Sequence, residues 1–226
     1  HGEPNNRNAH PIFDEGNEIV VIHNGIIENY NVLKTRLERE GYQFITDTDT
    51  ECLVHLIRSH YKNVMDFETA VRLALAEVDG TYGMCVLSKF DPDKIIAARK
   101  GSPLVLGVGD GEFIIASDAT AIVPYTRQVL YLMDGEMVIC DRDKFEIKTI
   151  HDEVIERELE EITFDLEEIE KGGYEHFMLK EINEQPDSIT NTMRGRIIKE
   201  NGLGKLGGLM NVTEKLKFAP RIIISA

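Results

Sequence analysis

The hydrophobic period changes near residue 80, and this change limits the folds that the chain can adopt. Before it, apolar residues recur at steps of three and four over residues 28–40 and 66–78 and in a stretch after Glu51, as on helices. After it come short apolar runs separated by turn residues, as in strands. Helices followed by a run of strands predict an α+β fold with antiparallel sheets. Several runs are apolar at nearly every position, so both faces of the sheet should be covered.

The predicted strands after the change are short and closely spaced. They cover residues 82–87, 94–98, 104–106, 112–116, 129–132 and 136–140. An acidic run over residues 152–170 follows, and it favours a solvated face beside a domain boundary over a metal site. A helix is then expected over residues 174–184, ended by Gln185 and Pro186.

One stretch near the start combines a strand with residues that can do chemistry. Residues 18–24 are a strand-type run that ends at Asn24 and Gly25, and a helical pattern follows. An Asn carboxamide and a Gly backbone N–H at the tip of a strand can converge on one oxygen, as an oxyanion hole requires. Asn-Gly between apolar runs is also a strong signal for a tight hairpin turn. The dipeptide alone leaves both interpretations open. His23, just before it, is expected to be a structural hydrogen-bonding residue rather than a base.

Asp49 stands at the start of the helix that follows this unit. An acidic side chain there stabilises the positive end of the helix, which is the simpler role. The alternative is that its carboxylate binds a substrate ammonium group. Thr48 and Glu51 have the spacing of a capping box at the same helix start.

Composition excludes several classes of partner. The formal net charge of −15 and the pI near 4.9 oppose binding to the phosphates of nucleic acid. No apolar run approaches the roughly 20 residues of a membrane span. The seven histidines show no metal-ligand arrangement. Three cysteines, odd in number and far apart, favour a reducing compartment, and we expect the cytoplasm. The chain begins with His1 inside what looks like a motif, so we interpret it as a fragment.

Several motifs occur in one order along the chain. They are His-Gly-Glu-Pro-Asn (1–5), Asn-Ala-His-Pro (8–11), Val-Ile-His-Asn-Gly-Ile-Ile-Glu-Asn-Tyr (21–30), Thr-Asp-Thr-Glu (48–51), Ala-Arg-Lys-Gly-Ser-Pro-Leu (98–104), Ile-Ala-Ser-Asp (115–118) and His-Phe-Met-Leu-Lys-Glu-Ile-Asn-Glu-Gln-Pro (176–186). This order resembles the glutamine–fructose-6-phosphate aminotransferase (isomerising) family, also called glucosamine-6-phosphate synthases, over essentially the whole chain. Residues 180–186 resemble the linker of that family, which distinguishes it from other glutaminase-bearing amidotransferases.

The resemblance implies a fold and a division into domains. The fold would be the four-layer αββα sandwich of N-terminal-nucleophile (Ntn) hydrolases, with antiparallel sheets, incomplete at the N-terminus. Residues 1–165 would form the class II glutamine amidotransferase (glutaminase) domain without its first part. Residues 166–220 would form the interdomain linker and helices, and residues 221–226 the first strand of a sugar-isomerase domain.

The resemblance also implies an activity. The parent enzyme would hydrolyse L-glutamine to glutamate and ammonia and transfer the ammonia to fructose 6-phosphate, giving glucosamine 6-phosphate. It would need no cofactor or metal, and the full-length parent would be a homodimer. Asn24 and Gly25 would form the oxyanion hole, Asp49 would bind the α-amino group of glutamine, and His1 would contact glutamine.

The chain departs from the family at its nucleophile. The family uses the thiol and the free α-amino group of an N-terminal cysteine, so an internal cysteine (Cys52, Cys85 or Cys140) cannot replace it. We therefore expect the fragment by itself to be inactive. Two rival interpretations remain: the glutaminase domain of another amidotransferase, such as the phosphoribosyl-pyrophosphate type, and a non-catalytic module that keeps the glutamine pocket.

Overall fold

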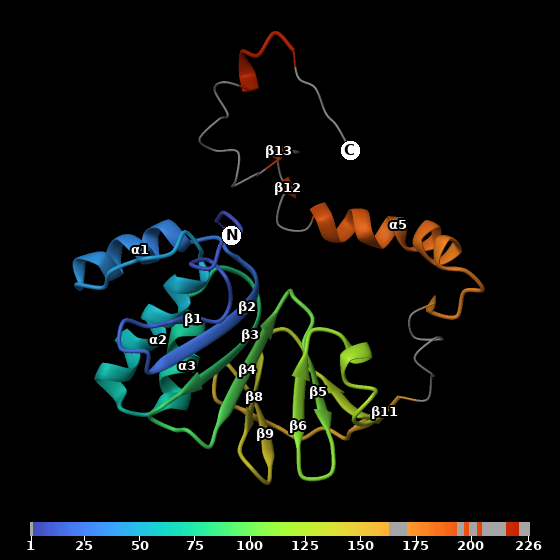
Figure 1. Cartoon of the computed structure of the whole chain (residues 1–226), viewed down its shortest axis with the longest axis horizontal. Coiled ribbons are helices and arrows are strands. Elements are labelled where there is room, and N and C mark those ends of the chain that lie inside the picture. Colours follow the sequence, from blue (N-terminus) through green and yellow to red (C-terminus); the bar gives the residue numbers. More distant parts are fainter. Residues whose placement is uncertain (1, 163–170, 194–196, 199–202, 205–215, 222–226) are drawn as a thin grey trace. The chain divides into compact units, whose positions relative to one another are not determined.

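A seven-stranded antiparallel sheet lies at the centre of the first of two units, His1–Ile169, in the computed structural model (Figure 1). The structure describes residues 2–162, 171–193, 197–198, 203–204 and 216–221. In spatial order the strands of this sheet are β1 (Ile12–Phe13), β2 (Ile19–Ile27), β3 (Gly80–Ser88), β4 (Ile95–Lys100), β8 (Glu136–Cys140), β9 (Phe145–Thr149) and β10 (Val154–Ile155). The first unit therefore holds most of the predicted strands.

Three helices cover one face of this sheet (Figure 1). They are α1 (Tyr30–Arg39), α2 (Thr50–Val64) and α3 (Phe67–Ala76). Their apolar residues face the sheet at helical spacing, as Leu33 and Leu37 do in α1. They form one core with strand residues such as Val21 and Met84. The three helices predicted from the sequence are therefore confirmed.

A four-stranded antiparallel sheet packs on the opposite face. Its strands in spatial order are β11 (Glu160–Glu161), β7 (Gln128–Tyr131), β5 (Val105–Val108) and β6 (Phe113–Ala116). Leu106 and Leu130 from this sheet share a core with Ala97 and Val138 of the large sheet. Every residue of β8 is buried, so this strand is covered on both faces as predicted.

The outer face of the small sheet is covered by a short segment. This is the 3-10 helix η1 (Ala119–Ala121) with the residues after it, where Ile122 packs with Val105 and Val129 in a third core. The described part of the first unit is thus layered as helices, sheet, sheet and this segment. The prediction of an α+β sandwich of antiparallel sheets is confirmed.

The second unit, Glu170–Ala226, contains helix α5 (Phe177–Met193) and the strand pair β12 (Ile197–Ile198) with β13 (Leu203–Gly204). The predicted helix end at Pro186 is wrong, because α5 continues through that residue. The missing N–H of a proline costs one hydrogen bond of the helix but does not always end it. In the described parts of both units, no helix is long and apolar enough to cross a membrane.

A buried carboxylate, Glu51, shapes the turn before α2. It is 1% exposed, and its oxygens accept hydrogen bonds from the backbone N–H groups of Ile45 (2.8 Å) and Thr46 (2.7 Å) and from the Thr46 hydroxyl (2.7 Å). Burial alone would raise the pKa of Glu51, but the neighbouring His55 ring and these donors outweigh it and lower the pKa. The Glu51 carboxylate therefore binds Ile45 and Thr46 instead of the Thr48 backbone. The predicted capping box between Thr48 and Glu51 is wrong.

Replacing Glu51 by glutamine is expected to lower the free energy of unfolding by about 1–3 kcal/mol. The two carboxylate oxygens of Glu51 accept from two backbone N–H groups, whereas a carboxamide has one oxygen. In the variant the NH2 group would therefore face a buried N–H that has lost its acceptor. Urea denaturation of both proteins measures the change. Glu38→Gln on the exposed side of α1 is the control and should shift stability by less than about 0.5 kcal/mol. Equal stability for the two variants would contradict the role given to Glu51.

Candidate functional site

Asn24 and Gly25 lie inside strand β2 rather than at its end. In the register of β2 and β3, Asn24 pairs with Gly83 and Gly25 pairs with Tyr82. The prediction that the strand ends at this dipeptide is therefore wrong. The hairpin alternative is wrong as well, because the central residues of a hairpin turn lie outside the ladder that they connect.

The side chains of β2 alternate between the two faces of the large sheet. His23 and Ile27 are buried on the face that the helices cover. Ile22, Asn24 and Ile26 point to the other face and are exposed. Ile22 and Ile26 are 47% and 45% exposed, so the small sheet does not cover this part of β2. The Asn24 carboxamide is therefore accessible from the face opposite the helices.

The backbone N–H groups of β2 alternate between its two edges. Asp14 N–H, just after β1, donates to Ile19 O at 3.0 Å, so odd-numbered residues of β2 present their polar backbone groups to the β1 side. Strand β1 pairs only with Val20 and Val21. The odd-numbered N–H groups farther along the strand therefore face an edge that β1 does not reach, and this alternation puts Gly25 N–H at that edge.

Asp49 lies at the same edge. It is the N-cap residue of α2, yet within the described residues its side chain makes no capping hydrogen bond to the helix. Its Oδ2 instead accepts a hydrogen bond from Ile27 N–H at 2.7 Å. The carboxylate thus binds the strand two residues beyond Gly25. The simple helix-cap interpretation of Asp49 does not describe this contact.

Strands β2 and β3 approach each other closely at Gly25. Gly25 has φ +141°, and a Cβ there would lie 2.1 Å from the Thr81 carbonyl oxygen. Gly80 on the facing strand has φ +129°, and its Cβ would lie 2.1 Å from the carbonyl oxygen of Ile26. The Thr81 hydroxyl accepts the Ile26 N–H at 3.2 Å. Only glycine fits at both positions, because the backbone of the other strand takes the place of a side chain.

Three side chains form a hydrogen-bonded group beneath this approach. Thr50 Oγ1 lies 3.2 Å from His23 Nδ1 and 3.1 Å from His10 Nε2. His23 Nε2 lies 3.3 Å from Thr81 O. Burial lowers the pKa of both rings, and the carboxylate of Asp49 opposes this shift. His23 makes the structural hydrogen bonds that the sequence predicts for it. The contact between His10 and Thr50 was not predicted, since 40 residues separate them in the sequence.

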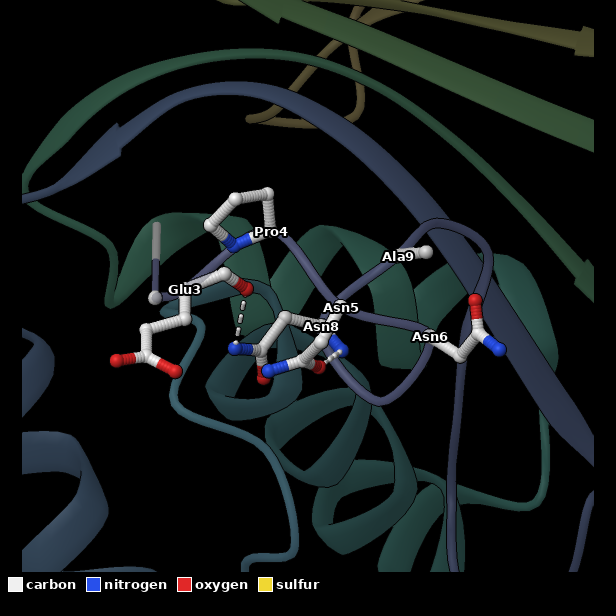
Figure 2. A pocket seen from close by; sticks show the side chains of 7 residues that line it. Glu3, Pro4, Asn5, Asn6, Asn8 and Ala9 are labelled. Atoms are coloured by element: carbon white, nitrogen blue, oxygen red, sulfur yellow. Dashed lines mark hydrogen bonds between the residues drawn. The ribbon is translucent and has the colours of Figure 1, made fainter.

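A hollow of about 530 Å³ lies in the loop before β1 (Figure 2). Asn8 organises this loop: its Nδ2 donates to Glu3 O at 2.9 Å, and its Oδ1 accepts the N–H of Asp47 at 3.0 Å. The hollow is therefore tied to the turn that carries Asp49. His1, predicted to contact glutamine, lies outside the described residues. The hollow is lined by Gly2, Glu3, Pro4, Asn5, Asn6, Asn8 and Ala9.

Comparison with known families assigns the part of the chain that holds these residues. Residues 3–124 match the model of the glutamine amidotransferase domain. The chain belongs to the glutamine amidotransferase domain family. It is 54% identical over its whole length to a glutamine–fructose-6-phosphate aminotransferase (isomerising) of Chlorobaculum tepidum and 50% identical to that of Bacteroides thetaiotaomicron. It spans 37% of the length of each of these relatives.

Solved structures show the fold of this amidotransferase domain. A glutamine phosphoribosylpyrophosphate amidotransferase from B. subtilis superposes with a TM-score of 0.57 at 24% identity, over 66% of this chain and 33% of that one. A structure of the allosteric regulatory enzyme of purine biosynthesis superposes with a TM-score of 0.56 at 25% identity, over 64% of this chain and 31% of that one. The class II amidotransferase fold, that of an Ntn hydrolase, is therefore confirmed.

The three cysteines of the first unit are placed as packing residues. Cys52 lies in α2, Cys85 in β3 and Cys140 in β8, and burial raises the pKa of each thiol to about 12. A thiol with such a pKa is almost wholly protonated near pH 7 and is a poor nucleophile. In the described residues, no group of three or more His, Cys, Asp or Glu side chains is arranged to hold a metal ion.

Proposed function

We propose that this chain is the glutaminase part of a glutamine–fructose-6-phosphate aminotransferase. The reaction is hydrolysis of L-glutamine to glutamate and ammonia, with transfer of the ammonia to fructose 6-phosphate to give glucosamine 6-phosphate. The identity of 54% and 50% to two proteins of that name, over the whole chain, supports this assignment. Fructose 6-phosphate would bind a sugar-isomerase domain beyond this sequence, and the intact protein would be a cytoplasmic homodimer.

The contact between Asp49 and Ile27 is the observation that carries the proposed site. It holds a carboxylate at the edge of β2 to which Gly25 N–H also points. In the proposal, this carboxylate binds the α-amino group of glutamine. Asn24 Nδ2 and Gly25 N–H stabilise the oxyanion formed when the side-chain amide is attacked. His1 also contacts glutamine.

The nucleophile is assigned to a residue outside these 226. The proposed chemistry uses a thiol with a free α-amino group on the same residue as its base. Cys52, Cys85 and Cys140 have their nitrogens in peptide bonds and their thiols in packed surroundings. The 226-residue chain alone is therefore proposed to be inactive towards glutamine.

The proposed division of the chain is the one predicted from the sequence. Residues 1–165 would be the glutaminase domain, residues 166–220 the linker and its helices, and residues 221–226 the start of the sugar-isomerase domain. The two compact units, His1–Ile169 and Glu170–Ala226, are compatible with this division.

Assays on the intact protein test the proposed function. With glutamine and fructose 6-phosphate, equal amounts of glutamate and glucosamine 6-phosphate should form, while the 226-residue chain alone should form neither. A product that depends on phosphoribosyl pyrophosphate instead would favour the rival amidotransferase. Glutamine binding by the intact protein without any hydrolysis would favour the non-catalytic module.

Asp49→Asn in the intact protein is expected to raise the KM for glutamine about 10-fold or more, with a smaller change in kcat. The variant keeps an oxygen that can accept the Ile27 N–H but loses the charge that attracts the ammonium group. Steady-state kinetics over a range of glutamine concentrations measures the change. The matched control is Asp47→Asn, two residues earlier in the exposed part of the same turn, which should leave KM within about twofold. A KM that stays the same in Asp49→Asn would remove the residue from the binding site.

A further inference from the structure

His23 contacts the backbone on the inner side of the Asn24–Gly25 segment. Its ring is 3% exposed, and its Nε2 would lie 3.0 Å from a Cβ at Gly25. The same Nε2 lies 3.3 Å from the Thr81 carbonyl oxygen that sets the close approach of the strands. The imidazole therefore occupies the space directly beneath Gly25.

Thr81 connects the two sides of Gly25. Its carbonyl oxygen meets the His23 ring, which lies before Gly25 in the sequence, and its hydroxyl accepts the Ile26 N–H, which lies after it. The His23 side chain before Gly25 and the Ile26 backbone after it thus contact one residue of the facing strand. A shift of His23 would release one of these two attachments.

The direction of the hydrogen bonds follows from their chemistry. A carbonyl oxygen can only accept, so His23 Nε2 carries the proton that meets Thr81 O. In the neutral ring Nδ1 is then an acceptor, and the Thr50 hydroxyl donates to it. The Thr50 oxygen accepts in turn from His10 Nε2–H. The three side chains form one chain of bonds that ends at Thr81.

The surroundings favour the neutral ring that this chain requires. Burial lowers the pKa of His23, the Asp49 carboxylate and the Thr81 carbonyl oppose the shift, and His10 adds to it. A charged His23 would have a proton on Nδ1 and would reverse the bond with Thr50. The order of donors and acceptors is therefore matched to one protonation state.

We propose that His23, fixed by Thr50 and His10, is a positioning residue for the oxyanion hole. It holds the β2 backbone so that Asn24 and Gly25 present their donors where charge develops on glutamine, without touching the substrate itself. The inference rests on the proposed glutaminase function and adds to it the residues that hold the donors in place. Donors that do not have to reorganise are what makes such a site effective.

A pair of substitutions at Thr50 tests this role in the intact protein. Thr50→Val keeps the shape of the side chain but removes the hydroxyl, whereas Thr50→Ser keeps the hydroxyl. In Thr50→Val the kcat for glutamine should fall about 10-fold while the KM stays within about twofold, because Asp49 still binds the ammonium group. Thr50→Ser should keep most of the wild-type kcat. Thr35→Val should behave as the wild type, because the Thr35 hydroxyl is exposed and donates to Asn31 O of its own helix.

Each outcome bears on the inference. An unchanged kcat in Thr50→Val overturns the positioning role while the proposed glutaminase function stands. A kcat in Thr50→Ser as low as that in Thr50→Val has the same consequence. A rise in KM equal to the fall in kcat also overturns it, because that result indicates general damage to the site. A wild-type protein that does not hydrolyse glutamine overturns the proposed function, and the positioning role with it.

Discussion

Replacing Asn24 by alanine in the intact protein is expected to lower the kcat for glutamine hydrolysis by about 10²–10³-fold. The Asn24 side chain is exposed on the sheet face opposite the helices and does not belong to the core between the sheet and the helices. The substitution should therefore remove one donor to the oxyanion and leave the fold intact. Initial rates of glutamate release over a range of glutamine concentrations give kcat and KM separately.

The pattern of the two constants distinguishes a lost oxyanion donor from other effects. Loss of a donor that acts only in the transition state lowers kcat and kcat/KM by the same factor. Asn63→Ala is a suitable control, because the Asn63 amide is exposed near the end of α2 and donates to Ser59 O within the helix. Unchanged kcat in Asn24→Ala would exclude Asn24 from the reaction. An unfolding midpoint well below that of the wild type would instead indicate a structural role.

The fold was predictable because its signals are local. Apolar residues at steps of three and four mark α1 to α3, and the strands from β3 to β8 correspond to short apolar runs between turns. The error at Asn24 has a physical reason. The side chains of β2 alternate between a buried and an exposed face, so Asn24 points to the exposed face without ending the strand. His23 is buried there because its ring nitrogens find partners.

The geometry of the candidate site was predictable only in part. Asn24, Gly25 and Asp49 stood out because of their types and their places beside predicted elements. The bond from Ile27 to Asp49 spans 22 residues and the bond between Thr50 and His10 spans 40, so only the folded chain brings them together. Thr50 gives no signal in the sequence, because a threonine at a helix start is ordinary. Its importance depends on which two rings reach its hydroxyl.

Position 25 requires a glycine more strictly than the other positions of the candidate site. Its φ of +141° is rarely adopted by residues with a side chain, and an added Cβ would meet the Thr81 carbonyl oxygen at 2.1 Å. The atom it would meet belongs to the backbone of β3, in the middle of the sheet, so it cannot move aside as the end of a flexible side chain can. Even the smallest side chain therefore has to separate the two strands or change the path of β2.

Gly25→Ala is accordingly expected to lower the free energy of unfolding by about 2–6 kcal/mol, from backbone strain and from overlap of about 1–3 kcal/mol each. Any folded protein that remains should lose most of its glutaminase kcat, because the N–H of residue 25 would move from its edge of β2. Gly111→Ala separates the two causes: it also has positive φ (+72°) but no atom lies within 4 Å of its added Cβ. Strain alone should cost that control about 1–2 kcal/mol and leave kcat unchanged. Equal losses of stability in the two variants would show that β3 leaves room at Gly25 and would contradict the close approach of the strands.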